Sequence, residues 1–253
     1  MRLIRSLLFY LGQIGSTLVF SPLSILLLPL PFPLRYYIVS RWAVFNLWWL
    51  KITCDVNYTV EGLENIPDQA AIIMCNHQSA WETLALQSIF MPQVWILKRE
   101  LLWIPIYGWG LATMQPIAID RGNAIRSIRQ IVNGGCSRLQ QGYWVVIFPE
   151  GTRLAPGEKG KYLPGGGLLA EKSGYPVVPV AHNAGYCWPR NTVLKQPGTI
   201  RMVIGPAIAS TGKTAHEITR QVEDWIEATV KKLPSPVHHK ATTHPEHSEN
   251  ILI

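Results

Sequence analysis

The sequence is poor in cysteine, with four residues along 253 positions. No two of them are close enough to form a Cys-x-x-Cys pair: they stand at Cys54, Cys75, Cys136 and Cys187. A disulfide framework and a zinc site are therefore both disfavoured. A reduced cytosolic setting is expected for the folded part of the chain.

Charge is also scarce. Charged residues make up 15% of the chain and hydrophobic residues 48%, whereas about 25% charged is usual in soluble domains. The net charge is nevertheless +7, and ten residues are tryptophan. A basic, apolar chain suits an anionic surface, which is either lipid or nucleic acid. The sequence has no basic helix and no paired cysteine–histidine spacing, so a nucleic-acid partner is disfavoured and membrane lipid is favoured.

Several catalytic motifs are missing. There is no Gly-x-Ser-x-Gly nucleophile elbow and no His-Glu-x-x-His zinc pair. The glycine run at 165–167 is not followed by Lys-Ser or Lys-Thr, so it is not a Walker loop and is expected to be a turn before a helix. If a catalytic base is present, the lack of a nucleophile motif suggests direct attack by a substrate hydroxyl.

The first fifty residues hold most of the apolar excess. No charge occurs between Arg5 and Arg35, and this stretch exceeds the ~20 residues that cross a bilayer. It is too long for a signal-peptide core and lacks a small-x-small cleavage site, so it is expected to be retained. Pro22 interrupts it and three prolines end it, and proline breaks or kinks helices. We expect a kinked single span or two short helices in one leaflet; a buried core helix is the alternative.

Positive charge flanks the stretch on both sides, which gives no clear orientation but slightly favours both ends on the cytoplasmic side. Three tryptophans follow, and indole side chains prefer the headgroup level of a bilayer: Trp42, Trp48 and Trp49. Residues 1–50 are therefore predicted to be a membrane-associated helical segment, with the domain that follows it facing the cytoplasm.

Residues 51–233 alternate between strand and helix patterns, which predicts an α/β domain with a mainly parallel sheet flanked by helices. The helix at 123–140 is expected to bury Ile125, Ile128 and Val132. "TAHE" at 214–217 predicts a capping box that opens a final helix. The expected strands are 52–62, 70–75, 94–98, 116–120, 143–148, 176–180 and 200–205, with a helix at 80–90 and a short helix or loop at 103–114.

The last segment, 234–253, is polar and holds four histidines. We expect a disordered tail there, and metal binding by the histidines is the weaker alternative.

"MCNHQSAWET", residues 74–83, carries the first candidate for chemistry. His77 follows a predicted buried strand, and Glu82 stands five residues later. Residues five apart on a regular helix point about 140° away from each other. They can meet if His77 lies in the turn before the helix and Glu82 in its first turn. Glu82 would then fix the tautomer of a histidine base. The alternative is a histidine satisfied by backbone and a routine first-turn acid.

"IFPEGTR", 147–153, is the second candidate, because Pro149 and Gly151 force a turn that projects Glu150, Thr152 and Arg153 together. The planar fork of arginine suits a phosphate, and Glu150 can hold that fork or accept from a hydroxyl. Arg121 also follows a strand and precedes a helix, where anions bind. A solvated turn with a local ion pair is the alternative for each.

These residues resemble the 1-acylglycerol-3-phosphate acyltransferases. The Asn-His-x-x-x-x-Asp motif of that family is matched by Asn76, His77 and Glu82, and Phe-Pro-Glu-Gly-Thr-Arg is matched in full at 148–153. "IAIDR" and "VVPVA" look like the family's other two motifs, and Pro179 is expected to interrupt the apolar strand of the second. Order and spacing agree over residues 70–185. Two positions depart: Glu82 replaces the usual aspartate, and Leu163 and Pro164 stand where many relatives carry a cation, with Lys161 just upstream.

The resemblance implies acyl transfer from acyl-CoA or acyl carrier protein to the free hydroxyl of 1-acylglycerol 3-phosphate, which gives phosphatidate. His77, oriented by Glu82, would be the general base. The substrate phosphate would be held by Arg121, Glu150, Gly151, Thr152 and Arg153, with Asn76 and Pro179 as supporting residues.

No metal or other cofactor is implied. Three alternatives remain open: an acyltransferase of the same superfamily with a different lysolipid acceptor, a non-catalytic membrane lipid-binding protein, and a lipid hydrolase in which His77 activates water. His182 is expected to be structural.

Overall fold

The computed structural model describes residues 1–235. Its centre is a seven-stranded sheet in the order β1-β7-β6-β2-β5-β3-β4, in which all neighbours are parallel except β6 and β7. The predicted α/β class with a mainly parallel sheet is confirmed. The strands are β1 (Val56–Glu61), β2 (Ile72–Cys75), β3 (Gln93–Lys98), β4 (Ile117–Ile119), β5 (Trp144–Ile147), β6 (Val177–His182) and β7 (Gly198–Ile204).

Helices cover both faces of the sheet, and this explains why its central strands are apolar apart from His182 at the end of β6. Every residue of β2, β5 and β6 is buried, as expected for parallel strands with two covered faces. The helices are α1 (Arg2–Leu26), α2 (Phe32–Val39), α3 (Arg41–Cys54), α4 (Trp81–Ile89), α5 (Tyr107–Thr113), α6 (Ala124–Gln140), α7 (Gly165–Ser173) and α8 (Ala215–Lys232), with short 3-10 turns η1 (Leu63–Asn65), η2 (Arg99–Trp103) and η3 (Ala184–Tyr186).

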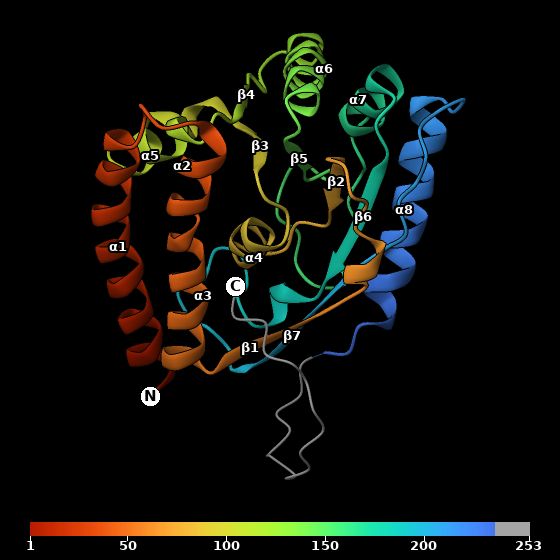
Figure 1. The fold of residues 1–253 in the computed structure, drawn as a ribbon. Helices are drawn as coiled ribbons and strands as arrows, with labels where there is room; N and C mark the ends of the chain where they lie inside the picture. Colours follow the sequence, from red (N-terminus) through yellow and green to blue (C-terminus); the bar gives the residue numbers. More distant parts are fainter. Residues whose placement is uncertain (236–253) are drawn as a thin grey trace.

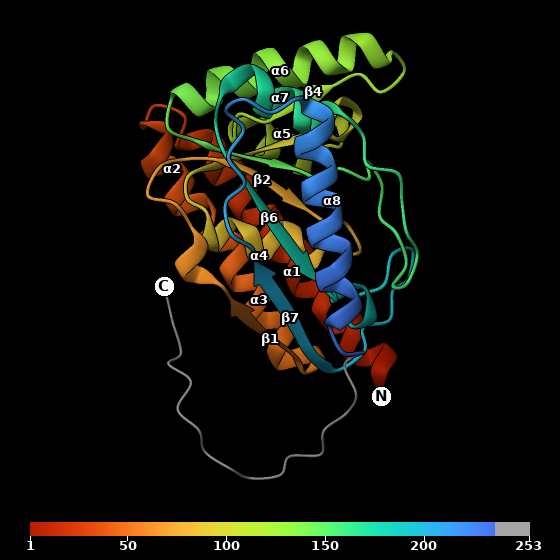
Figure 2. The ribbon, with the colours of Figure 1, turned by 90° about the vertical axis from the view of Figure 1, so that its right-hand side faces the viewer.

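The helices form two groups. Figure 1 shows α4, α3 and α1 stacked outward on one side of the sheet, and α7 and α8 on the other. Helix α8 packs against β6 and runs along it (Figure 2). The predicted capping box opens this helix, because Thr214 Oγ1 accepts from the Glu217 amide and Glu217 accepts in return. Ile218, Val222 and Ile226 form its buried face.

The N-terminal segment consists of three helices, α1, α2 and α3. Helix α1 continues through Pro22 to Leu26 as one helix, and α2 and α3 then return the chain to the sheet. Among the described residues, α1 is the one helix long and apolar enough to cross a membrane. Only 11% of the apolar 18-residue stretch within α1 is buried, so α1 is not a core helix. It is an apolar surface helix that could anchor the chain to a membrane.

Contacts near both ends fix α1 to the rest of the chain. Toward its N-terminus, Lys195 is only 2% exposed, and its Nζ donates to Tyr10 Oη at 2.7 Å. The same ammonium lies 4.5 Å from the ring centroid of Trp188. Toward its C-terminus, the Ser21 hydroxyl donates to the carbonyl of Ile106. Helix α1 therefore follows the surface of the domain rather than projecting from it.

Three local predictions were wrong in detail. The strand expected at 52–62 begins only at Val56, because α3 extends to Cys54 and Asp55 ends it in the left-handed conformation, φ 55°. In α6, Ile125 is 76% exposed, and the buried stripe consists of Ser127, Ile131, Gly135 and Leu139. Pro179 does not interrupt its strand, since β6 is continuous. The tail predicted from residue 234 lies outside the described residues except for its first two positions.

Candidate active site

Five parallel strands end at one edge of the sheet, and the candidate residues lie there. β2 is hydrogen-bonded to β5 on one side and β6 on the other, all parallel. His77 follows β2 and Glu150 follows β5, so two segments far apart in the chain become neighbours. This is the edge at which α/β sheets place their reactive groups.

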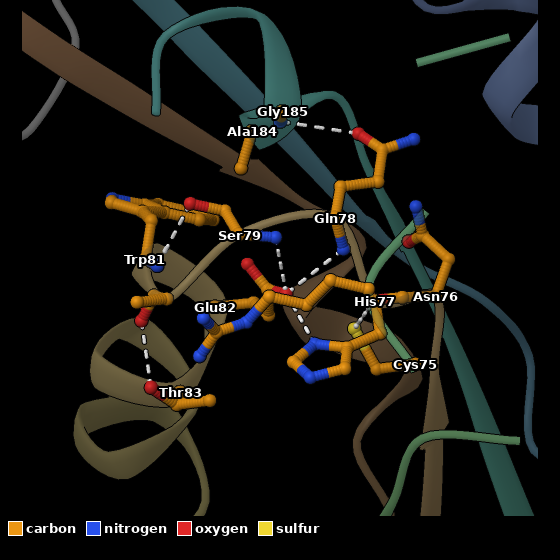
Figure 3. A network of polar contacts seen from close by, with 12 residues as sticks. Cys75, Asn76, His77, Gln78, Ser79, Trp81, Glu82, Thr83, Ala184 and Gly185 are labelled. Atoms are coloured by element: carbon orange, nitrogen blue, oxygen red, sulfur yellow. Dashed lines mark hydrogen bonds and ion pairs between the residues drawn. The ribbon is translucent and has the colours of Figure 1, made fainter. Parts of the chain in front are cut away.

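His77 and Glu82 meet in the geometry that their spacing permits. Helix α4 begins at Trp81, so His77 precedes the helix and Glu82 lies in its first turn. His77 Nδ1 lies 2.7 Å from Glu82 Oε1 (Figure 3). The same oxygen accepts from the amides of Gln78 at 3.0 Å and Ser79 at 2.9 Å. A carboxylate can only accept, so the His77 proton sits on Nδ1 and Nε2 is left as an acceptor.

Glu82 is ionised although it is fully buried. Burial alone would raise the pKa of this carboxyl, but His182, His77 and the amide of Ser79 outweigh burial and hold the pKa below its ordinary value. Glu82 Oε2 makes no hydrogen bond within the described residues and lies 3.7 Å from His182 Nε2. Burial lowers the pKa of His182, against the attraction of Glu82.

His182 has a structural position, as expected. Its Nδ1 accepts from the Ala184 amide at 3.1 Å, and its Nε2 donates to the Asn76 carbonyl at 2.8 Å. The Asn76 side chain accepts a hydrogen bond from the His182 amide at 2.9 Å and donates one to the His182 carbonyl at 3.0 Å. Asn76 therefore ties the end of β2 to the end of β6. Unlike His77, it does not line the large cavity at this edge of the sheet.

Three contacts that sequence reasoning did not anticipate fix His77. The Phe148 ring stacks on the imidazole with centroids 4.0 Å apart and planes 15° apart. The His77 amide donates to Glu150 Oε2 at 2.7 Å, and its carbonyl accepts from the Leu154 amide at 2.8 Å. All three partners come from the segment after β5. The motif that contains His77 and the motif at 148–153 therefore fix each other's position.

Glu150 has a different environment from the one predicted. It makes no ion pair with Arg153 among the described residues; its Oε2 instead accepts from the His77 amide. Burial raises the pKa of Glu150 to about 8, the His77 amide opposes the shift, and Glu227 and Glu82 add to it. At neutral pH the carboxyl therefore holds a proton and offers a donor as well as an acceptor.

Arg121 and the turn at 150–153 line one cavity of about 910 Å³ together with His77. Arg121 and Arg153 are exposed, and neither guanidinium makes a hydrogen bond or ion pair within residues 1–235. Gly151 has φ 68°, a conformation that glycine adopts without strain, so it turns the chain beneath these side chains. Pro179 is not among the lining residues. Most of the remaining apolar wall comes from β3, α5 and α6, whereas α1 contributes Phe20 and three hydroxyl side chains.

The described residues contain no group of three or more His, Cys, Asp or Glu placed to hold a metal ion. The nearest thiol is that of Cys75, directly before Asn76, and burial raises its pKa well above the ordinary value. It is therefore a poor nucleophile. The site combines an oriented histidine, two guanidinium groups without a partner in the part of the chain that the structure describes, and a large, mainly apolar cavity.

Comparison with known proteins gives a consistent result. The family described as Acyltransferase matches residues 57–183. A 1-acyl-sn-glycerol-3-phosphate acyltransferase of Pseudomonas aeruginosa is 43% identical over 97% of this chain and 96% of its own length. The enzyme of that name from Helicobacter pylori is 36% identical over 47% of this chain and 52% of its own.

A solved structure has the same fold. The crystal structure of the 1-acyl-sn-glycerophosphate acyltransferase of Thermotoga maritima superposes with a TM-score of 0.76, covering 91% of this chain and 95% of that one at 24% identity.

Proposed function

The chain belongs to the acyltransferase family, and from this premise we propose that it transfers a fatty acyl group to the free 2-hydroxyl of 1-acylglycerol 3-phosphate and yields phosphatidate. The Pseudomonas aeruginosa relative, which carries this activity in its name, is similar over nearly the whole length of both chains. The donor is a thioester of coenzyme A or of acyl carrier protein.

The observation that carries the mechanism is the contact between His77 and Glu82. An ionised carboxylate 2.7 Å from Nδ1 leaves Nε2 as a base in a cavity large enough for an acyl chain. Nε2 takes the proton of the acceptor hydroxyl while its oxygen attacks the thioester carbonyl. The tetrahedral intermediate then expels the thiolate, which receives the proton from His77. Glu82 stabilises the imidazolium between these two steps.

The acceptor phosphate is assigned to Arg153 and Arg121, whose guanidinium groups are unpaired within residues 1–235 and suited to phosphate oxygens. The protonated carboxyl of Glu150 can donate to the phosphate or to a glycerol oxygen. Gly151 and Thr152 shape the turn between them. This assignment favours a phosphomonoester acceptor over a lysolipid without a phosphate dianion.

The apolar face of α1 is assigned to a membrane. Leu7, Leu11, Ile14 and Leu18 on α1 are all more than half exposed, which is costly in water and favourable in lipid. The catalytic domain would lie on the cytoplasmic side, where acyl-CoA and acyl carrier protein are available.

The test is labelled acyl transfer from acyl-CoA to 1-acylglycerol 3-phosphate in membranes that carry the protein, with wild type beside His77→Ala. Labelled phosphatidate should form with wild type and fall about 10²–10⁴-fold in the variant, the usual contribution of a general base. Equal product from both proteins would remove His77 from the reaction.

Controls distinguish the other functions. Free fatty acid released without acceptor would indicate a hydrolase. Binding of lysolipid with no turnover from any donor would indicate a lipid-binding protein. Turnover of other lysolipids, without turnover of 1-acylglycerol 3-phosphate, would indicate that the acceptor is a different lysolipid.

A further inference from the structure

A second cavity of about 390 Å³ lies between α1, α4 and the turn from η2 to α5. Its wall on the α1 side includes Ile14 and Leu18, and its wall on the α4 side includes Leu84. None of these three residues lines the larger cavity. Both volumes lie in the ~300–1,000 Å³ range of small-molecule sites.

The two cavities meet at the active site. Five residues line both of them: Thr17, Trp42, Thr83, Tyr107 and Arg153. Arg153 is the one charged residue in that set, and its guanidinium has no partner within residues 1–235. The junction thus combines a guanidinium that has no partner in the described residues with two branches. The larger branch is mainly apolar and contains His77, and the smaller branch has apolar side chains such as Leu84 beside polar ones such as Gln13.

The proposed reaction brings two acyl chains to one point. The donor carries the chain to be transferred, and the acceptor carries a chain of its own together with a phosphate. Resting on that function, we propose that the smaller cavity holds the acyl chain of the lysophosphatidate acceptor, with Arg153 at its phosphate, while the larger cavity takes the acyl chain of the donor. The hydroxyl and the thioester then meet beside His77.

The smaller cavity is positioned to receive a lipid directly from the membrane. Ile14 is 58% exposed and Leu18 is 51% exposed, and both belong to the apolar outer face of α1. The wall of the cavity is therefore continuous with the surface assigned to the membrane. An acceptor chain can pass between the two without exposure to water, which avoids the cost of hydrating it.

The test narrows the smaller cavity and compares chain-length preferences. Ile14→Trp and Leu18→Trp add bulk at residues that line only this cavity. Leu11→Trp is the matched control, because Leu11 is 70% exposed on the same helix and lines neither cavity. Initial rates are measured in mixed micelles with long-chain and short-chain lysophosphatidates, and separately with long-chain and short-chain acyl-CoA.

The long-to-short ratio of kcat/KM for the acceptor should fall about tenfold or more in either cavity variant, since apolar pockets discriminate ~10–200-fold per misfitted group. The donor ratio, and both ratios in Leu11→Trp, should stay at wild-type values. Unchanged acceptor ratios in both cavity variants, or a change in the donor ratio instead, would overturn the assignment. Wild type that forms no phosphatidate at all would overturn the proposed function itself.

A direct measurement supports the kinetic one. A lysophosphatidate with a diazirine at the end of its chain should label Ile14, Leu18 or Leu84 after illumination, as located by mass spectrometry. Labels on Leu111 or Ile128, which line only the larger cavity, would place the acceptor chain there and contradict the assignment.

Discussion

One carboxylate oxygen organises the turn that carries His77, the proposed base. Glu82 Oε1 accepts from the His77 ring and from the amides of Gln78 and Ser79, so it fixes both the imidazole and the backbone that follows it. The two amides lie just before the N-cap residue Ala80, so Glu82 reaches back from the first turn to the segment that precedes the helix. An acid in the first turn also suits the helix dipole. The spacing of five between His77 and Glu82 is therefore a property of a helix start.

Glu82→Asp tests how closely the length of this side chain is matched. Aspartate is shorter by one carbon–carbon bond, about 1.5 Å, so its carboxylate cannot keep all three contacts unless the turn moves. We expect kcat to fall about 10–100-fold with little change in KM. Glu82→Gln, which keeps the length and loses the charge, should lower kcat at least as much.

Steady-state kinetics on both variants, with circular dichroism to verify folding, separates length from charge. An aspartate variant with wild-type kcat would show that the turn adjusts freely and that the side-chain length is immaterial.

Arg153→Lys tests the assignment of the phosphate. Lysine keeps the charge but lacks the planar fork, so a bidentate contact is lost. A hydrogen bond to a charged group contributes ~1.5–3 kcal/mol. KM for 1-acylglycerol 3-phosphate should therefore rise about 10–100-fold while kcat changes little. Arg190→Lys is a control, since Arg190 lies nearby, donates to the Arg153 carbonyl and lines neither cavity. Equal KM values in wild type and Arg153→Lys would contradict the assignment.

The sequence predicted part of this site because part of it is local. Whether His77 and Glu82 can meet depends on a few residues of backbone and the start of one helix. The contact of the His77 amide with Glu150 depends on β2 and β5 being neighbours, and no local pattern contains that information. Arginine beside glutamate in "PEGTR" suggested an ion pair, whereas burial instead leaves Glu150 protonated.

At the level of elements, helix positions were predictable and their buried faces less so. α6 buries a stripe that contains Ser127 and Gly135 rather than its first isoleucine. A Cβ on Gly135 would lie 2.4 Å from Leu169 Cδ2, so the bare glycine makes room for α7. The Ser127 hydroxyl donates to the Asp120 carbonyl. Apolar periodicity alone misses such a face, because its small and polar members are chosen by the partner that packs there.

The capping box of α8 offers a test at this scale. Thr214→Ala removes the acceptor for the Glu217 amide, and loss of such a cap costs about 1 kcal/mol of unfolding free energy. The thermal midpoint should fall by a few degrees, while kcat stays at the wild-type value because Thr214 lines neither cavity. Thr214→Ser, which keeps the hydroxyl, should match wild type. A Thr214→Ala protein as stable as Thr214→Ser would show that the box contributes nothing.

At the scale of the whole molecule, α1 is joined to the domain by a buried ammonium. Burial lowers the pKa of Lys195 from 10.5 to about 8. Below pH 8 the folded and unfolded states are both protonated, and the cost of burying the charge is fully present. Between pH 8 and 10.5 the unfolded state binds more protons, so stability rises with pH over this window.

The substitution Lys195→Met tests whether the buried ammonium makes the stability rise with pH in this window. Methionine has no charge to bury, so the stability of wild type relative to the variant should increase as pH rises from 8 to 10.5. Thermal midpoints of the two proteins in detergent, taken across that range, give the difference and cancel the titration of all other groups. A difference that is constant with pH, or that moves in the opposite direction, would show that the ammonium is not buried in the way described.

The contacts at both ends of α1 also bear on how concentration should be expressed for this protein. If α1 rests in lipid, the domain cannot swing away from the bilayer, and His77 stays at one height above it. The lysophosphatidate acceptor then reaches the site by lateral diffusion. The quantity that sets the rate with respect to the acceptor is its mole fraction in the surface, and adding inert lipid slows turnover even when the amount of acceptor in the tube is unchanged.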